Sequence, residues 1–281
     1  MEELILLRRT GRIDMIRYEL ENLSKKIRKD ILIMGYHSGT KGAHIGGGMS
    51  IVEILAVLYG EIMKYDINNP NDDLRDRFIL SKAHSGIGLY AALHQVGFIS
   101  DKEFENAFIP GSPFYKHPRM DIKHGIEFTG GSLGQGLSLA VGSALALRLK
   151  NNPAKIYVIL GDGECDEGSI WEACNSIVHF NLNNVVTIVD RNNLQNDGPT
   201  EKIMKLSDIG KRFESMGFFV IDVNGHDVTE LEKAFGQETD KPKVIIAHTI
   251  KGKGVSFAEN NVDWHIGYLT KELYEKAMRE L

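Results

Sequence analysis

The sequence predicts an α/β protein, with a doubly wound, mostly parallel sheet and helices on both faces. After residue 154, short runs rich in valine and isoleucine alternate with helical segments, a pattern typical of parallel sheets covered on both sides. Hydrophobic residues make up 42% of the chain and charged residues 25%, the balance of a folded soluble protein. No linker rich in proline, glycine or serine divides the 281 residues, so we expect one domain spanning residues 1–281.

The first half of the chain is expected to be mainly helical. Apolar residues three and four apart predict an amphipathic helix over residues 13–36. A glycine-rich segment follows, and a second helix is expected over residues 50–63, with Ser50 as its N-cap. "RFILSKAH" predicts a short strand running into a loop, and "GLYAALHQVG" a helix. Residues 108–134 are irregular, and a long apolar helix is expected over residues 135–149.

The second half of the chain alternates strand and helix. Strands are expected at residues 155–160, 185–190, 218–223 and 243–248, and helices at 168–180, 206–217 and 227–235. Ligands of such sheets bind beyond the carboxyl ends of the strands. The loops that follow those ends are therefore where the chemistry is expected: "GDGECDEG", "RNNLQNDG", "NGHD" and "TIKGKGVSFAENNVDWH".

Bulk properties exclude several classes of protein. A formal net charge of −5 argues against nucleic-acid binding. No apolar run approaches the roughly 20 residues that a membrane-spanning helix needs, and the N-terminus lacks the features of a signal peptide. The two cysteines, Cys165 and Cys174, indicate neither a zinc site nor a disulfide scaffold. A reduced, cytoplasmic setting is expected.

Four carboxylates crowd the loop that follows the strand at residues 155–160. Asp162, Glu164, Asp166 and Glu167 lie within "GDGECDEGSIWEA". Asn192 follows Asp162 by 192 − 162 = 30 residues, about one βαβ unit, so both side chains are expected at one rim of the sheet. Carboxylate and carbonyl oxygens suit Mg²⁺ or Ca²⁺, and glycines before a helix N-terminus suit phosphate. A plain turn in a solvated loop accounts for "GDG" alone, but not for "NN" one unit later.

The spacing "GDG…NN" resembles the thiamine-diphosphate-binding motif. Four blocks also resemble, in order, the N-terminal diphosphate-binding domain of transketolases: "RDRFILSKAH", "TGGSLGQGLSLAVGSALA", "GDGECDEGSIWEA" and "DRNNLQNDG". The similarity covers about residues 20–268. It implies the thiamine-diphosphate-binding fold, and it implies thiamine diphosphate and Mg²⁺ (or Ca²⁺) as cofactors, the former acting as an electron sink.

The resemblance implies specific roles near the cofactor. Asp162, Asn192 and the backbone carbonyl of Leu194 would bind the metal, which would bridge the diphosphate. The backbone N–H of Gly163 would contact a phosphate. Two further residues, in "GGSLG", would contact the cofactor near its aminopyrimidine: Gly131 and Leu133.

The other acids of this region are divided by the resemblance. Glu167 would belong to a carboxylate network across a subunit interface and take part in catalysis. Glu172 would belong to the same network beside the cofactor, although its place in "SIWEA" also fits an ordinary helix surface. Glu164 and Asp166 are expected to be solvated.

Four histidines in loops match the family's channel above the thiazolium: His44, His84, His117 and His265. Imidazole suits such a channel because it can give and take a proton near neutral pH. Any one of them also fits a buried, hydrogen-bonded loop histidine. Lys251 would neutralise diphosphate charge, with a solvated loop as the alternative. Two residues depart from the family pattern close to the channel, Ile45 in place of proline and Lys116 in place of glycine, which puts the substrate in question.

The pyrimidine-binding domain that follows in full-length transketolases has no counterpart before Leu281. We therefore expect the N-terminal subunit of a split transketolase, active only with a C-terminal partner chain in an α₂β₂ assembly. It would move a two-carbon ketol unit from a ketose, usually a phosphate, to an aldose. A domain cut from a longer protein is the alternative in architecture.

The alternatives in function are half of another thiamine-diphosphate enzyme or a non-catalytic cofactor-binding module. The other enzymes are a 1-deoxyxylulose-5-phosphate synthase and a 2-oxo acid dehydrogenase α-chain. The dehydrogenase is expected to lack the channel histidines, whereas the synthase also has a histidine before a glycine-rich helix start. A dinucleotide-binding domain is disfavoured because no G-x-G-x-x-G follows a first strand.

Overall fold

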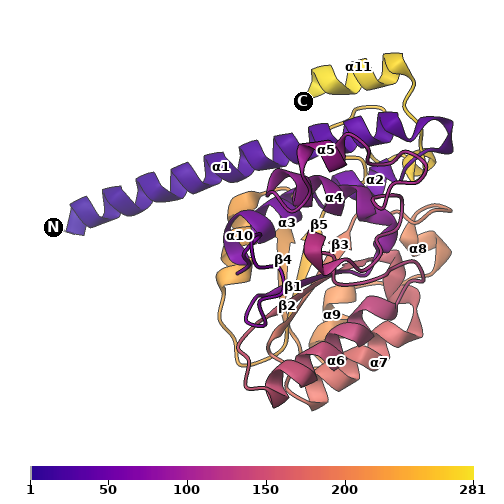
Figure 1. The fold of residues 1–281 in the computed structure, drawn as a ribbon. Helices are drawn as coiled ribbons and strands as arrows, with labels where there is room; N and C mark the ends of the chain where they lie inside the picture. Colours follow the sequence, from indigo (N-terminus) through magenta and orange to yellow (C-terminus); the bar gives the residue numbers. More distant parts are fainter. Residues whose placement is uncertain (1) are drawn as a thin grey trace.

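A five-stranded parallel sheet forms the centre of the molecule (Figure 1). The computed structural model describes the backbone of residues 2–281 and the side chains of residues 15–281. The strand order is β1-β2-β3-β5-β4, and every neighbouring pair is parallel. The prediction of a doubly wound α/β fold is therefore confirmed. The strands are β1 Arg77–Leu80, β2 Ile156–Gly161, β3 Val185–Arg191, β4 Phe219–Asn224 and β5 Lys243–His248.

Helices cover both faces of this sheet, with α6, α7 and α9 below it and α1 to α4 above it in Figure 1. Successive strand residues point to opposite faces, so Ile156 and Val158 belong to the lower core whereas Tyr157 and Ile159 belong to the upper core. The lower helices are α6 Gln135–Leu149, α7 Gly168–His179 and α9 Ile209–Ser215. The upper helices are α1 Glu2–His37, α2 Ile45–Ser50, α3 Val52–Val57, α4 Gly86–Gln95 and α10 Val228–Gly236.

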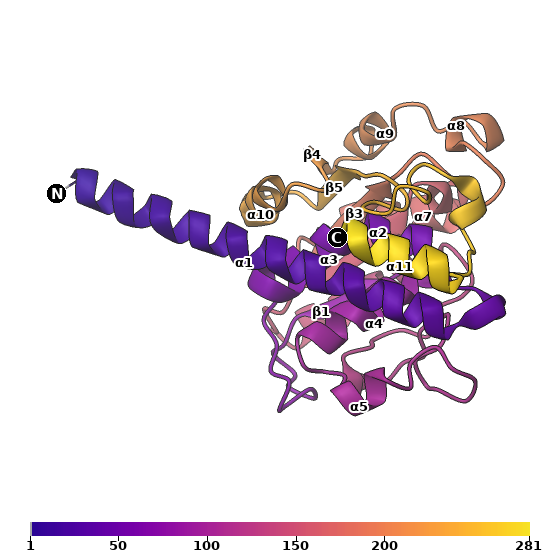
Figure 2. The ribbon, with the colours of Figure 1, turned by 90° about the horizontal axis from the view of Figure 1, so that it is seen from above.

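The C-terminal helix lies against the N-terminal helix. Figure 2 shows α11 Lys271–Glu280 running alongside α1, whose N-terminal part extends beyond the body of the molecule. The rings of Tyr36 and Tyr274 stack with their centroids 4.7 Å apart. Two single-turn helices complete the set: α5 Asp101–Phe104 and α8 Thr200–Ile203.

The expected helix over residues 50–63 is wrong at its start. The glycine-rich segment before it is itself helical, as α2, and Ser50 is the last residue of α2 rather than an N-cap. The glycines allow α2 to pack closely on α4, because a Cβ on Gly48 would lie 2.5 Å from Cγ2 of Ile87. The Ser50 hydroxyl instead donates to the carboxylate of Asp190, at 2.7 Å. After α3 the chain continues as one π-helical turn, Leu58–Ile62.

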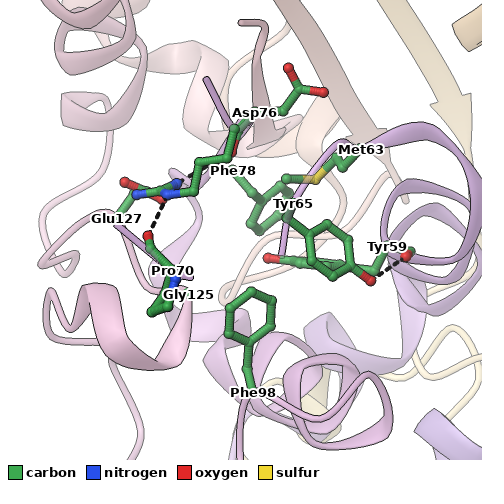
Figure 3. A pocket seen from close by; sticks show the side chains of 10 residues that line it. Tyr59, Met63, Tyr65, Pro70, Asp76, Phe78, Phe98, Gly125 and Glu127 are labelled. Atoms are coloured by element: carbon green, nitrogen blue, oxygen red, sulfur yellow. Dashed lines mark hydrogen bonds and ion pairs between the residues drawn. The ribbon is translucent and has the colours of Figure 1, made fainter. Parts of the chain in front are cut away.

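A small hollow of about 10 Å³ lies at the amino-terminal edge of the sheet, before β1 (Figure 3). Four aromatic rings, those of Tyr59, Tyr65, Phe78 and Phe98, line part of it, and the Tyr65 hydroxyl donates to the Tyr59 carbonyl at 2.6 Å. Arg75 forms an ion pair with Glu127 beside it. The hollow has room for about one water molecule, so it belongs to the packing of the fold. Over residues 2–281, no helix combines the length and the apolar character needed to cross a bilayer.

Candidate active site

A cavity of about 340 Å³ lies at the carboxyl-terminal edge of the sheet. Loops after β1, β2, β3 and β5 line it, together with the glycine-rich α2 and the segment before α6. This is the edge at which a doubly wound sheet binds its ligands. Nine of the predicted site residues line the cavity: His84, Gly131, Leu133, Asp162, Gly163, Asn192, Leu194, Lys251 and His265.

The three predicted metal ligands lie at the ends of adjacent strands. Gly161 pairs in register with Asp190, which places Asp162 beside the loop that carries Asn192. The Asp162 carboxylate also accepts a hydrogen bond from the backbone N–H of Asn193, at 2.6 Å. Asp162, Asn192 and Leu194 therefore line the same cavity, and the amide oxygen of Asn192 accepts from the backbone N–H of Leu194 at 3.1 Å.

The electrostatics of Asp162 fit a cation at this place. Burial, and next the nearby charge of Asp190, raise the pKa of Asp162 to about 6. The nearest cationic group, Nη1 of Arg191, is 3.5 Å away. Among the described side chains, no cluster of three or more His, Cys, Asp or Glu residues could hold a metal. The predicted ligands would instead give the mixed oxygen set of a hard cation, which takes its remaining ligands from phosphate and water.

Gly163 comes into close contact with the opposite loop. A Cβ at this position would lie 2.5 Å from Cγ of Gln195, so only glycine fits without displacing that side chain. Its backbone N–H donates to Oδ1 of Asp162, at 2.8 Å. The N–H that the sequence assigned to a phosphate is thus bonded to the neighbouring carboxylate, and its role toward a phosphate stays a prediction.

A buried polar network that the sequence did not predict supports the Asn192 side chain. Asp190 accepts hydrogen bonds from Nδ2 of Asn192 at 2.8 Å and from Nζ of Lys82 at 2.5 Å. Thr249 also donates to it. Although burial raises the pKa of Asp190, the Lys82 charge and the hydrogen bonds from Lys82, Thr249 and Ser50 outweigh it and hold the pKa below its usual value. The sequence gives one indication of this network: Lys82 comes shortly after the apolar strand β1, and Asp190 lies near the end of the apolar strand β3.

Glu164 and Asp166 are not simply solvated, so that expectation is wrong. Glu164 is 2% exposed and accepts from the Ser81 hydroxyl at 2.5 Å and from the backbone N–H of Gly134 at 2.9 Å. It therefore ties the loop after β2 to the loop after β1 and to the start of α6. Asp166 is partly buried and accepts from Nε2 of Gln195, at 2.6 Å.

The four predicted histidines meet in one cluster, although they come from four separate segments. The ring centroids of His44 lie 5.5 Å from those of His84, 5.6 Å from His117 and 5.3 Å from His265. His84 and His265 line the cavity. His44 contacts both of them from outside the cavity wall, and His117 contacts His44.

Burial and neighbouring positive charge keep these histidines neutral. Burial, followed by His117 and Lys116, lowers the pKa of His44 to about 4. Burial, followed by Lys251, lowers the pKa of His265 to about 3. The pKa values of His84 and His117 are lowered in the same way. A neutral imidazole has one donor and one acceptor nitrogen, which suits binding and proton exchange with hydroxyl groups.

Lys251 is 2% exposed, so the alternative of a solvated loop lysine is wrong. Its ammonium donates to the Leu194 carbonyl at 3.1 Å and contacts Nδ1 of His265 at 2.9 Å. The lysine makes Nδ1 of His265 an acceptor, so the ring proton sits on Nε2. Burial, and next the charge of Lys82, lower the pKa of Lys251 to about 8. A cation already contacts the carbonyl that was predicted as a metal ligand.

Glu167 and Glu172 lie outside the cavity. Glu167 is the exposed N-cap residue of α7, and Glu172 is exposed further along the same helix. The structure of this single chain therefore places both on the surface. Their roles in a network between subunits stay predictions.

Comparisons with known proteins agree with this geometry. The family described as "Transketolase, thiamine diphosphate binding domain" matches residues 22–280. The chain is 40% identical over 265 residues to an apulose-4-phosphate transketolase subunit from Phocaeicola vulgatus, covering 93% of each chain. It is 41% identical over 241 residues to the 6-deoxy-6-sulfo-D-fructose transketolase subunit SqwG of a Clostridium species, covering 85% of this chain and 88% of the relative.

Solved transketolase structures share the fold. The transketolase of Campylobacter jejuni superposes with a TM-score of 0.82 at 30% identity, over 95% of this chain and 42% of that one. The transketolase of Leishmania mexicana gives the same TM-score at 28% identity, over 92% and 40%. The chain thus spans about two fifths of these solved transketolases. The family match covers most of the chain, and the predicted metal ligands and the histidines gather at one edge of the sheet. The chain therefore belongs to the transketolase family and corresponds to its thiamine-diphosphate-binding domain.

Proposed function

We propose that this chain is the N-terminal subunit of a split transketolase. In this proposal it transfers a two-carbon ketol unit from a ketose, usually a phosphate, to an aldose acceptor. The observation that carries the proposal is the cavity that the three predicted metal ligands, Asp162, Asn192 and Leu194, line together with His84 and His265. A metal-and-diphosphate site next to neutral imidazoles is what ketol transfer needs.

Asp162, Asn192 and the Leu194 carbonyl would hold Mg²⁺ or Ca²⁺ on the diphosphate of thiamine diphosphate, which supplies an electron sink for cleaving a bond next to a carbonyl. Lys251 would shift its hydrogen bond from the Leu194 carbonyl toward a phosphate oxygen once a metal takes that carbonyl. Gly131 and Leu133, on the cavity wall, would contact the rest of the cofactor.

The histidine cluster would handle the sugar. His84 and His265, on the cavity wall, would hydrogen-bond the hydroxyl groups nearest the cleaved bond. Nε2–H of His265 is free to donate because Lys251 occupies Nδ1. His44 and His117 would bind hydroxyls further out and exchange protons with them, which their low pKa values favour when the acceptor form is needed.

A C-terminal partner chain would complete the site. The relative from Phocaeicola vulgatus, itself named as a transketolase subunit, has nearly the same length as this chain, and the chain spans about two fifths of the solved transketolases. The partner would carry the pyrimidine-binding domain, and Glu167 and Glu172 would meet it or a second copy of this chain in an α₂β₂ assembly.

Single-domain folding of residues 1–281 and a cytoplasmic location are part of this proposal, and the two buried free thiols support the location.

The relatives' names point to the class of substrate. One name specifies a sugar phosphate and the other a sulfonated sugar. Anionic sugars are therefore the donors and acceptors to try first.

The test is to mix the chain with its partner, thiamine diphosphate and Mg²⁺, and to assay ketol transfer over a panel of ketose donors and aldose acceptors. Turnover that requires all four components supports the proposal. Cofactor binding without turnover from any ketose would reject it. Decarboxylation of pyruvate under the same conditions would assign the chain to another class of thiamine-diphosphate enzyme.

A further inference from the structure

The loop "NGHD", residues 224–227 after β4, was expected to carry chemistry but contributes no residue to the cavity wall. Its histidine nevertheless contacts the loop after β5, which does line the cavity. Nε2 of His226 accepts a hydrogen bond from the backbone N–H of Ile250 at 2.8 Å. The ring proton therefore sits on Nδ1, which donates to Oε2 of Glu53 at 2.9 Å. His226 thus joins a carboxylate on α3 to the residue immediately before Lys251.

Arg28, on α1, holds the same turn from its other side. Its guanidinium forms a two-point ion pair with Glu53, at 2.6 and 2.8 Å. Its Nε also donates to the Lys253 carbonyl at 3.1 Å. Both Arg28 and Glu53 are buried. The two arms that leave Glu53 therefore end at residues 250 and 253, on either side of Lys251.

Lys251 needs a fixed backbone to stay where it is. Its buried ammonium makes its contacts with neutral groups, two backbone carbonyls and Nδ1 of His265. Burial, and next the charge of Lys82, lower the pKa of Lys251 to about 8. A long lysine side chain in such a place gains hydration by turning out into water. The turn is tightly built, because φ of Gly252 is +80° and a Cβ there would collide with the Ala258 carbonyl.

Stability alone does not explain the pair of Arg28 and Glu53. A buried ion pair can be replaced by well-packed apolar residues with little or no loss of stability. This pair, however, is bonded through Nε of Arg28 and through His226 to two points of one turn. It therefore determines where the backbone of residues 250–253 lies, and with it the direction in which the Lys251 side chain leaves the turn.

We propose that His226, held by Glu53 and Arg28, is a positioning residue for the diphosphate site. It fixes the turn at residues 250–253, so that Lys251 reaches into the cavity and holds His265 in one tautomer. This rests on the proposed function, in which Lys251 interacts with the diphosphate. Because His226 acts through Lys251, its effect exists in the free protein, before any ligand binds.

Two substitutions cut the network at different points. His226→Asn places an amide nitrogen near the position of Nδ1, so the bond to Glu53 is kept and the Ile250 N–H loses its acceptor. His226→Gln places an amide oxygen near the position of Nε2, so the bond to Ile250 is kept. His226→Asn is expected to stay folded because the buried carboxylate keeps its partners, and urea unfolding checks this.

Binding of inorganic diphosphate in the presence of Mg²⁺ compares the two variants. The Kd is expected to rise about tenfold in His226→Asn, because the Lys251 ammonium is no longer held toward the diphosphate. In His226→Gln it should stay within about twofold of the wild type. Equal weakening in both variants, or no weakening in either, would overturn the proposal.

A double-mutant cycle tests whether the effect passes through Lys251. In a Lys251→Met background, His226→Asn should cause no further loss of diphosphate affinity. Losses that add would mean that His226 acts by another route, and the proposal would be wrong. The matched control is His248→Asn, which removes an exposed histidine bonded to Asp222 at 2.8 Å, two residues before Ile250. It should leave the Kd unchanged, and a loss as large as that of His226→Asn would also count against the proposal.

NMR of the ligand-free protein keeps this inference separate from the proposed function. In the wild type, the ring nitrogens of His265 should report a protonated Nε2 and a hydrogen-bonded Nδ1, because Lys251 contacts Nδ1. His226→Asn should shift the Nδ1 signal or mix the two tautomers, and His226→Gln should not. Identical His265 signals in the wild type and His226→Asn would reject the positioning role. If the signals differ as expected but the wild-type assembly gives no ketol transfer, the proposed function is rejected and the positioning role is supported.

Discussion

The ammonium of Lys82 and the carboxylate of Asp190 form an ion pair with 2.5 Å between Nζ and Oδ2, and both side chains are at most 2% exposed. The same oxygen accepts from Nδ2 of Asn192, so the pair fixes which side of that amide is its oxygen. The loop after β1 and the end of β3 are thereby joined directly behind the predicted metal site. Removing one partner would leave a buried charge without compensation.

Lys82→Met is expected to destabilise the chain by about 3–5 kcal/mol, because the Asp190 carboxylate stays buried and unpaired. Urea unfolding of the chain alone measures this. The matched control is Lys150→Met, which breaks a pair with Asp73 in which both side chains are more than 60% exposed; it should cost less than about 1 kcal/mol. Similar losses in the two variants would show that the buried pair has no special weight.

Asp162→Asn is expected to abolish Mg²⁺-dependent binding of thiamine diphosphate. An amide replaces the only carboxylate among the three predicted metal ligands, so the attraction for a divalent cation falls. Without metal, the variant should unfold at the same or a higher denaturant concentration than the wild type at pH 7, because the ionised carboxylate is buried at a cost, as its raised pKa of about 6 indicates. Calorimetry with and without Mg²⁺ measures the first effect and urea unfolding the second.

Asp197→Asn is the matched control for that experiment. Asp197 lines the same cavity but is exposed and accepts a hydrogen bond from Asn196. The variant removes the same charge from the same wall without removing a predicted ligand. If it lost metal-dependent binding as completely as Asp162→Asn, general charge at the cavity would explain the binding, and a specific metal ligand would not.

The sequence was sufficient for the sheet and for the place of the site. Apolar runs of β-branched residues located β2, β3 and β5 to within one residue, because strands buried on both faces leave little freedom of composition. The rule that ligands bind beyond the carboxyl ends then predicted that Asp162 and Asn192 lie at this edge, and both line the cavity there. The histidines were found through motif resemblance, since no periodicity links His44 to His265.

What the sequence missed depends on contacts between distant segments. Glu164 looks like one more surface acid in a charged loop, and only the folded chain shows Ser81 and Gly134 converging on it. The glycine run Gly46 to Gly48 is typical of a loop, yet it is helical because α4 packs against it at close range. Both errors arise because local composition does not report the partner that a residue meets after folding.

Glu164→Ala is expected to destabilise the chain by about 2–4 kcal/mol. Three donors, the Ser81 hydroxyl and the N–H groups of Gly134 and Gly161, lose a buried charged acceptor. Hydrogen exchange should quicken at Gly134 and Gly161 before it changes elsewhere in the sheet. Unchanged exchange at these amides would mean that water replaces the carboxylate without loss.

Glu167→Ala is the companion substitution. It should leave the stability of the isolated chain nearly unchanged and weaken the assembly instead. Glu167 is exposed in the isolated chain, so unfolding of the chain alone should change by less than about 0.5 kcal/mol. If Glu167 belongs to a network between subunits, the dissociation constant of the assembly should rise, which analytical ultracentrifugation would detect. An assembly as tight as the wild type, with full ketol transfer, would contradict that role.

The histidine cluster predicts how stability depends on pH. The pKa of His44 is about 4 in the folded chain, against an ordinary value of 6.5, so between these pH values the unfolded state binds more protons than the folded state. Stability is therefore fully present above pH 6.5 and falls as the pH drops toward 4, by an amount on the order of 2–3 kcal/mol for this residue.

His44→Gln, which cannot be protonated, should make the pH dependence of the unfolding free energy shallower over this window. His179→Gln, at an exposed position on α7, is the control and should follow the wild type. Inorganic diphosphate should also flatten the wild-type curve, because an anion beside the cluster favours protonated imidazole. If His44→Gln and the wild type lost stability in parallel from pH 6.5 to 4, folding would not lower the pKa of His44, and this prediction would be wrong.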